Sequence, residues 1–154
     1  MTAALYLCVR RSAPPLEPSM PVSVALRLPS DVTQVEDAVE LMARHCFAGR
    51  RPCSRTAFRL RVALAEALSN AIVFGNQEDP TKQVTVIAEL FPELIRLCVA
   101  DEGLGFDPIA IPQPTDPDGL ERPCGRGLFI IRNLVDQLEF NERGNAIWMT
   151  LPRC

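Results

Sequence analysis

The sequence predicts an α+β sandwich, in which helices cover one face of a mixed, mainly antiparallel sheet. Strand-like segments occur in two adjacent pairs, and segments with helical periodicity lie before and between those pairs. The resulting order is strand, helix, helix, strand, strand, loop, helix, strand, strand. With 154 residues, of which 47% are hydrophobic and 23% charged, the chain fits one soluble globular domain.

Residues 1–21 are expected to form a flexible leader. They show little hydrophobic periodicity and contain four prolines close together, Pro14, Pro15, Pro18 and Pro21. Proline-rich segments of this kind favour an extended chain without regular pairing. The domain is therefore expected to cover residues 22–154.

The first predicted strand is "VSVALRL", residues 22–28, in which apolar residues alternate. Ser30 or Asp31 can cap the helix that follows, because a short polar side chain before an apolar-periodic segment is typical of a helix N-terminus. Ser54 can cap a second helix, which is expected to end near Phe74.

Two hairpins are predicted. Residues 83–90 and 94–101 are strand-like and are joined by Phe-Pro-Glu, and residues 137–142 and 145–151 flank Arg-Gly. Short connections that contain Pro or Gly are typical of antiparallel pairs.

A long loop and a third helix lie between the hairpins. The segment Pro108–Pro123 contains five prolines and can sustain neither helix nor sheet. Long loops inside small domains are often functional lids. Helical periodicity returns after Gly125.

Composition excludes several classes of protein. The net charge of −3 gives no electrostatic reason to expect nucleic acid, and no segment is long enough to span a membrane. The six cysteines lack CxxC spacing, which disfavours a zinc site and predicts reduced thiols in a cytoplasmic protein. Basic residues cluster over residues 44–61, either as a solvated helix connection or as a docking patch for an acidic partner.

Three groups of residues can carry chemistry. Glu66 and Asn70 share one helix face, away from a leucine stripe that can pack on the sheet. Taken alone, this pair is either an exposed polar flank or a site. Asp101 ends an apolar strand and is followed by Gly103 and Gly105, which let a flat ligand approach the backbone.

The third group lies at the start of the last predicted helix. Gly125 and Gly127 leave backbone N–H groups accessible there, and a helix N-terminus suits phosphate. Each group by itself is a weak indication, but their order along the chain makes a nucleotide site the stronger interpretation.

The segments "EALSNAIVFGN", "DEGLGF" and "GRGLFII" resemble the N, G1 and G2 boxes of the GHKL ATPases, which share the Bergerat fold. The similarity covers about residues 22–152 and is greatest to the anti-sigma factor serine/threonine kinases, because the boxes lie close together. It implies a Bergerat-type two-layer sandwich whose loop over residues 108–123 is an ATP lid. It also implies ATP/ADP and Mg²⁺ as cofactors.

The resemblance assigns a role to each site residue. Asp101 would accept the adenine amino group, and Gly103 and Gly105 would shape the adenine pocket. Asn70 would hold Mg²⁺, and Glu66 would be the general base. The residues expected to cradle the phosphates and complete the nucleotide site are Gly125, Arg126, Gly127 and Leu128.

The implied function is a cytoplasmic protein-serine/threonine kinase that phosphorylates a STAS-domain anti-sigma factor antagonist and binds a sigma factor, as a homodimer. A non-catalytic, ATP-dependent partner-switching module is the alternative. Two departures from the family pattern bear on this choice: Phe74 stands where the kinases often have histidine, and Asn145-Ala146 replace a common threonine. A sensor histidine kinase is disfavoured because no acid follows His45 in the phosphoacceptor pattern.

Overall fold

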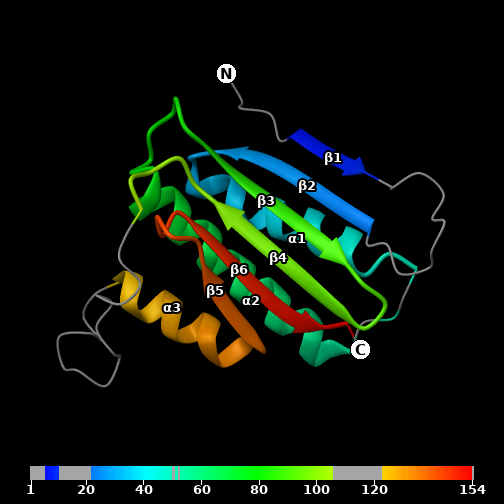
Figure 1. Cartoon of the computed structure of the whole chain (residues 1–154). Coiled ribbons are helices and arrows are strands. Elements are labelled where there is room, and N and C mark those ends of the chain that lie inside the picture. The colour runs from blue at the N-terminus through cyan, green and yellow to red at the C-terminus, as the bar shows by residue number, and fades with distance from the viewer. Residues whose placement is uncertain (1–5, 11–21, 50, 52, 106–122, 154) are drawn as a thin grey trace.

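The structure is a computed structural model that describes residues 6–10, 22–49, 51, 53–105 and 123–153. In this part of the chain a single sheet is covered on one face by three α-helices, which confirms the predicted α+β sandwich (Figure 1). The strands lie in the order β1-β2-β3-β4-β6-β5, and every neighbouring pair is antiparallel. Among the described residues the sheet is therefore antiparallel throughout rather than mixed.

Both predicted hairpins are confirmed. The first consists of β3, Gln83–Leu90, and β4, Leu94–Ala100, and the second of β5, Gln137–Phe140, and β6, Ala146–Pro152. Strands β4 and β6 pair with each other, so the two hairpins form one continuous surface.

One strand lies inside the predicted leader. Residues Tyr6–Arg10 form β1, which pairs with β2, Val22–Pro29, so that Cys8 lies opposite Ala25. The segment is only five residues long, too short for its periodicity to stand out, and its pairing depends on a partner edge elsewhere in the sequence. The sheet therefore begins before residue 22, while residues 11–21 lie outside the described part.

One of the two predicted cap residues, Asp31, caps the 3₁₀ turn before the first helix, whereas Gln34 stands at the N-cap position of the helix itself and makes no side-chain cap bond. A 3₁₀ turn, η1, Val32–Gln34, precedes α1, Val35–Cys46, and the Asp31 side chain accepts the Thr33 N–H at 2.9 Å. Ser30 is buried instead, and its hydroxyl donates to the Lys82 carbonyl at 2.7 Å.

The other helices start earlier than predicted. Helix α2 spans Ser54–Asn70 with Cys53 at its N-cap position, and a π-helix, η2, Ala71–Gly75, continues it to the predicted end. Helix α3 covers Pro123–Leu134, so it begins before Gly125. Proline at the first position of a helix is favourable, because its missing N–H has no partner there anyway.

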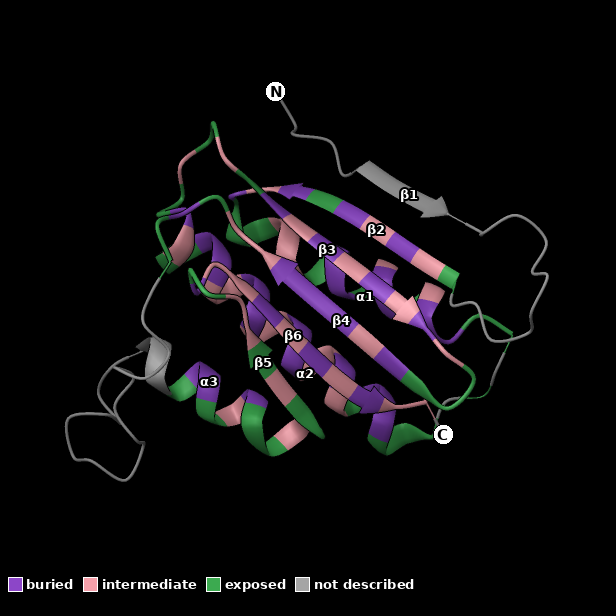
Figure 2. Ribbon diagram, viewed as in Figure 1, coloured by how far each residue is buried: buried purple, intermediate pink, exposed green. Residues whose placement is uncertain are grey.

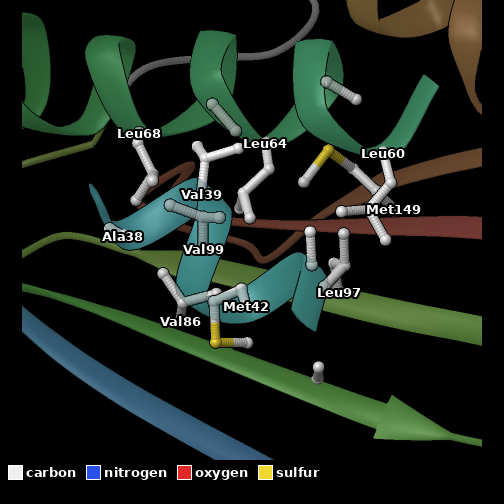
Figure 3. Close-up of a cluster of buried hydrophobic side chains, with 14 of the residues drawn as sticks. Ala38, Val39, Met42, Leu60, Leu64, Leu68, Val86, Leu97, Val99 and Met149 are labelled. Carbon is white, nitrogen blue, oxygen red and sulfur yellow. The ribbon is translucent and has the colours of Figure 1, made fainter. Parts of the chain in front are cut away.

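The core fixes the rotation of α2. One stripe of α2 and η2 is fully buried, namely Leu60, Leu64, Leu68 and Ile72. Leu60, Leu64 and Leu68 face Leu97 and Met149 of the sheet, with Met42 of α1 alongside (Figure 3). Burial of each such side chain contributes about 1.5–3 kcal/mol. Buried and partly buried residues alternate along β3 (Figure 2), as expected of a strand with one face on the core. This packing holds Glu66 and Asn70 away from the core.

The cysteines only partly match the prediction of reduced thiols. Cys46 and Cys98 are free and buried, and burial raises the pKa of the Cys46 thiol to about 12 and that of Cys98 to about 11. Cys53 is disulfide-bonded, so the prediction is wrong for this residue. In the described ranges no helix combines the length and the apolar composition that a membrane span requires.

Candidate functional site

Asp101 lies directly after β4, where the main chain and its own turn hold it. Its N–H donates to the Asn145 carbonyl at 2.9 Å, and its Oδ1 accepts the Gly103 N–H at 2.8 Å. Within the described ranges nothing donates to its second oxygen, Oδ2. Burial raises the pKa of the Asp101 carboxyl, while the Gly103 hydrogen bond and the charge of Lys82 oppose the rise. The side chain therefore keeps one acceptor oxygen for a ligand.

Glycines surround this carboxylate. A Cβ atom at Gly75 would lie 2.7 Å from Asp101 Oδ1 and closer still to Cγ and Oδ2. At Gly103 a Cβ would overlap the Gly75 carbonyl and lie 2.8 Å from Asp101 Oδ1. Gly105 has a φ of +82°, and a side chain there would overlap the Arg143 carbonyl. The predicted glycines thus permit the close approach of three chain segments around Asp101, and the structure adds Gly75 to the set.

Asn76 holds the turn that contains Asp101, and sequence reasoning missed it. This asparagine is fully buried, and its Nδ2 donates to Ser30 Oγ at 3.0 Å and to the Gln83 carbonyl at 3.1 Å. Its Oδ1 accepts the Glu102 N–H at 2.8 Å. One amide therefore links the ends of β2 and β4 to the start of β3. The available signal was an asparagine that closes the apolar segment "AIVFGN", but its partners lie far away in the sequence.

Asn145 supports the same turn from the β5–β6 hairpin. Its side chain receives a hydrogen bond from Asn141 Nδ2 at 2.6 Å and donates to the Gly103 carbonyl at 3.4 Å. The Asn141 Oδ1 in turn accepts the Asn145 N–H at 3.0 Å. The residue that replaces the common threonine of the resembling kinases therefore contacts the Asp101 turn through both its main chain and its side chain.

A second group of site residues lies between α2 and α3. Glu66 and Asn70 are half-buried, and Gly127 of α3 lies against them. A Cβ atom at Gly127 would be 2.9 Å from Asn70 Nδ2 and 3.1 Å from Glu66 Oε2. In the part of the chain that the structure describes, neither side chain has a hydrogen-bond or ion-pair partner. Their polar ends are therefore available beside a position where a side chain is missing.

The π-helix connects the two groups. In η2 the Asn76 N–H donates to the Ala71 carbonyl at 2.8 Å, five residues back in the chain. A π turn contains more residues than an α turn, so it rotates the positions that follow. Asn70 then contacts Gly127 of α3, whereas Gly75 contacts Asp101. Such insertions in α-helices are frequent at functional sites.

The remaining predicted residues are placed only in part. Gly125 lies in the first turn of α3, and Arg126 is exposed, without an ion pair among the described residues. Leu128 is 7% exposed and belongs to the hydrophobic core. The predicted ATP lid lies outside the described residues, apart from Pro123 at the start of α3. Phe74 is 46% exposed.

Together, the fold and the site define an α+β sandwich of the nucleotide-binding class, with an acid and glycines after a strand and a carboxylate–amide pair on a helix. The family model described as Histidine kinase-like ATPase domain matches residues 28–151. The chain belongs to this family, and the resemblance to the GHKL ATPases is confirmed.

Within this family, the chain is similar to several individual proteins. The chain is 30% identical over 96 residues to serine-protein kinase RsbW of Oceanobacillus iheyensis, which covers 58% of the chain and 61% of that protein. It is 35% identical over 83 residues to an anti-sigma F factor of Shouchella clausii, which covers 52% of the chain and 56% of that protein. Serine-protein kinase RsbW of Bacillus cereus is 26% identical over 98 residues, 59% of the chain and 61% of the relative. The chain thus spans about three fifths of the length of these curated relatives.

Proposed function

We propose that the chain is an ATP-dependent protein-serine/threonine kinase that acts as an anti-sigma factor and phosphorylates a STAS-type antagonist. The observation that carries the proposal is Glu66, a half-buried carboxylate with open oxygens beside Asn70 and Gly127. A module that only binds nucleotide has no need of a base at this place. The names of the similar proteins, serine-protein kinase and anti-sigma F factor, support the same function.

The Asp101 turn fits the adenine of ATP. The Oδ2 atom can accept the adenine amino group while Oδ1 keeps its bond to Gly103. Gly103 and Gly105 let the chain close against the Gly75 and Arg143 carbonyls, and this would shape the turn on which a flat ring lies. On the other side, the free backbone N–H groups at the start of α3, which begins at Pro123 and includes Gly125 in its first turn, suit the phosphates, and the Arg126 side chain adds positive charge.

The residues present also fit Mg²⁺. The Asn70 amide is half-buried and has no hydrogen-bond partner among the described residues, and its oxygen is the kind of hard ligand that Mg²⁺ prefers. Asn70 would hold the ion, with phosphate oxygens completing its shell. When bound, the ion would neutralise charge on the phosphates.

The chain's own contribution to transfer is a positioned base. Glu66 would take the proton of the antagonist's serine hydroxyl as that oxygen forms a bond to the γ-phosphorus of ATP. The bond from the γ-phosphorus to the β–γ bridging oxygen breaks, and the products are ADP and phosphoserine. Positioning and charge neutralisation would supply most of the acceleration.

The same proposal includes a sigma factor as the alternate partner, a homodimer and a cytoplasmic location. A second candidate function is a partner-switching module that binds ATP without transferring phosphate. It is favoured by Phe74, which stands where the resembling kinases often have histidine.

The test uses Glu66→Gln with labelled ATP and a candidate STAS-domain antagonist. We expect ATP affinity to stay within about twofold of the parent, and transfer to fall by about 10² to 10⁴, the usual contribution of a positioned base. Glu36→Gln, an exposed site on α1, is the matched control and should change neither quantity. Unchanged transfer in Glu66→Gln would remove the base assignment. If the parent releases a partner on ATP binding but transfers no phosphate, the module is the correct function.

A further inference from the structure

The outward face of α2 carries an unexplained basic and aromatic surface. Because the leucine stripe of α2 faces the sheet, the opposite stripe is directed outward. Along it, Arg55, Phe58, Val62 and Glu66 recur at spacings of three and four residues, as expected for one helix face. Phe58 is 62% exposed, an unusual position for a large aromatic ring.

The charged residues of this part of α2 are all basic. From Ser54 to Ala65 the helix contains three arginines and no acid. Arg61 pairs with Glu40 of α1 at 2.8 Å, but Arg55 and Arg59 have no ion pair among the described residues. The chain as a whole has a net charge of −3, so these arginines form a local exception. Aromatic residues and arginine are the types most enriched in the energetically dominant parts of protein interfaces.

We propose that Arg55, Phe58, Arg59 and Val62, here termed the α2 surface, form a docking site for an acidic segment of the protein that presents the hydroxyl to Glu66. This inference rests on the proposed function. Phe58 precedes Glu66 by eight residues, or about 12 Å along the helix. One small folded partner can therefore contact the α2 surface and reach Glu66 together.

The observations favour a protein partner over other anions. A membrane or a nucleic acid presents a large negative field, which the net charge of the chain would oppose beyond the immediate contact. An acidic segment with one apolar side chain would pair with Arg55 and Arg59 and cover the exposed Phe58 ring.

The test measures binding without turnover. The probe is a fluorescein-labelled 15-residue peptide of Asp and Glu around a central Leu-Phe pair, and its counterpart has Asn and Gln at the acidic positions. By fluorescence anisotropy we expect the acidic peptide to bind the full chain with submillimolar affinity and the neutral peptide at least fivefold more weakly.

Two variants locate the contact. Arg55→Glu combined with Arg59→Glu should weaken binding of the acidic peptide by about tenfold or more, since each exposed ion pair is worth up to about fivefold in affinity. Phe58→Ala should weaken binding of both peptides by about threefold or more. The matched control combines Arg27→Glu and Arg132→Glu, two exposed arginines on β2 and α3. It makes the same change in net charge and should leave binding within twofold.

Several results would overturn the proposal: no binding of the acidic peptide at 1 mM, equal binding of both peptides, or equal weakening in the control. Tighter binding of vesicles with 30% phosphatidylserine, or of a DNA duplex, would assign the surface to those anions instead. ATP affinity measured on the same proteins distinguishes a failure of the proposed function from a failure of the docking proposal. If the parent chain binds the acidic peptide but no ATP, the proposed function is refuted, whereas the docking surface is still supported.

Discussion

The change of Asp101 to Asn tests the proposed adenine contact at the level of single atoms. Asp101 Oδ1 accepts the Gly103 N–H at 2.8 Å, so the amide oxygen of asparagine must occupy that position. The amide NH₂ then takes the place of Oδ2 and presents a donor where the adenine amino group needs an acceptor. A buried mismatch of this kind costs about 1–3 kcal/mol, which corresponds to about 5- to 150-fold in ATP affinity.

The same geometry predicts a change in nucleotide preference. Inosine triphosphate carries a carbonyl in place of the adenine amino group, so the asparagine NH₂ can donate to it. We expect the ratio of ATP to inosine triphosphate affinity, measured by titration calorimetry, to fall by at least tenfold in Asp101→Asn. Glu102→Gln removes a charge from the neighbouring, exposed residue and is the matched control. An unchanged ratio in Asp101→Asn would show that Asp101 does not contact the base.

The proposed contact also requires that Asp101→Asn does not destabilise the fold. The direction of the pKa shift of Asp101 predicts how its stability should change. Burial raises the pKa of Asp101 above its usual value of 3.8, so the folded state disfavours the carboxylate. This destabilisation is present above the raised pKa and disappears as the pH falls below 3.8. Asp101→Asn should therefore melt at the same temperature as the parent or higher at pH 7. A lower melting temperature at pH 7 would mean that lost affinity reports local unfolding.

Other perturbations test the surroundings of the site. Asn76→Ala leaves the buried Ser30 hydroxyl, the Gln83 carbonyl and the Glu102 N–H without this partner, and should lower the free energy of unfolding by about 1–3 kcal/mol in urea titrations. No loss would show that water replaces the amide. Gly127→Ala places a methyl group 2.9 Å from Asn70 Nδ2 and should reduce phosphate transfer by about tenfold or more. Its stability, followed by calorimetry, should rise or stay level because alanine favours helix. Unchanged transfer would show that Gly127 plays no part in the reaction. Cys46, with its pKa raised to about 12, should resist iodoacetamide at pH 8 in the folded protein and react in urea, as mass spectrometry can show; rapid labelling of the folded chain would contradict the burial.

Features that repeat along the chain could be predicted from the sequence. The leucine stripe of α2 has helical spacing, and it correctly indicated the side opposite to Glu66. The hairpins were predictable because their strands are adjacent in sequence and their turns are short. β1 was missed because its strand character depends on pairing with β2, and pairing partners are not local information.

The same distinction between local and tertiary information holds for the residues of the candidate site. Asp101 and Gly103 are neighbours in sequence, so their association could be anticipated. Gly75 and Asn76 belong to the site only because η2 turns the chain toward Asp101, and no periodicity rule predicts a π-helix. The residues that hold the turn from a distance, Ser30 and Asn145, acquire their role only through tertiary contacts.

The hydrogen bonds of Asn76 also decide when the proposed nucleotide site becomes ordered. A turn that a ligand must organise loses backbone entropy at the moment of binding, at about 1–2 kcal/mol per residue. The Glu102 N–H is already fixed to a buried amide that spans β2 and β3, so the turn loses this freedom when the sheet forms. The turn proposed to hold adenine is therefore ordered by the protein's own hydrogen bonds, without nucleotide. Under the proposed function, nucleotide exchange at this turn should require no unfolding, and any conformational coupling to a partner protein would involve the α2–α3 side of the site.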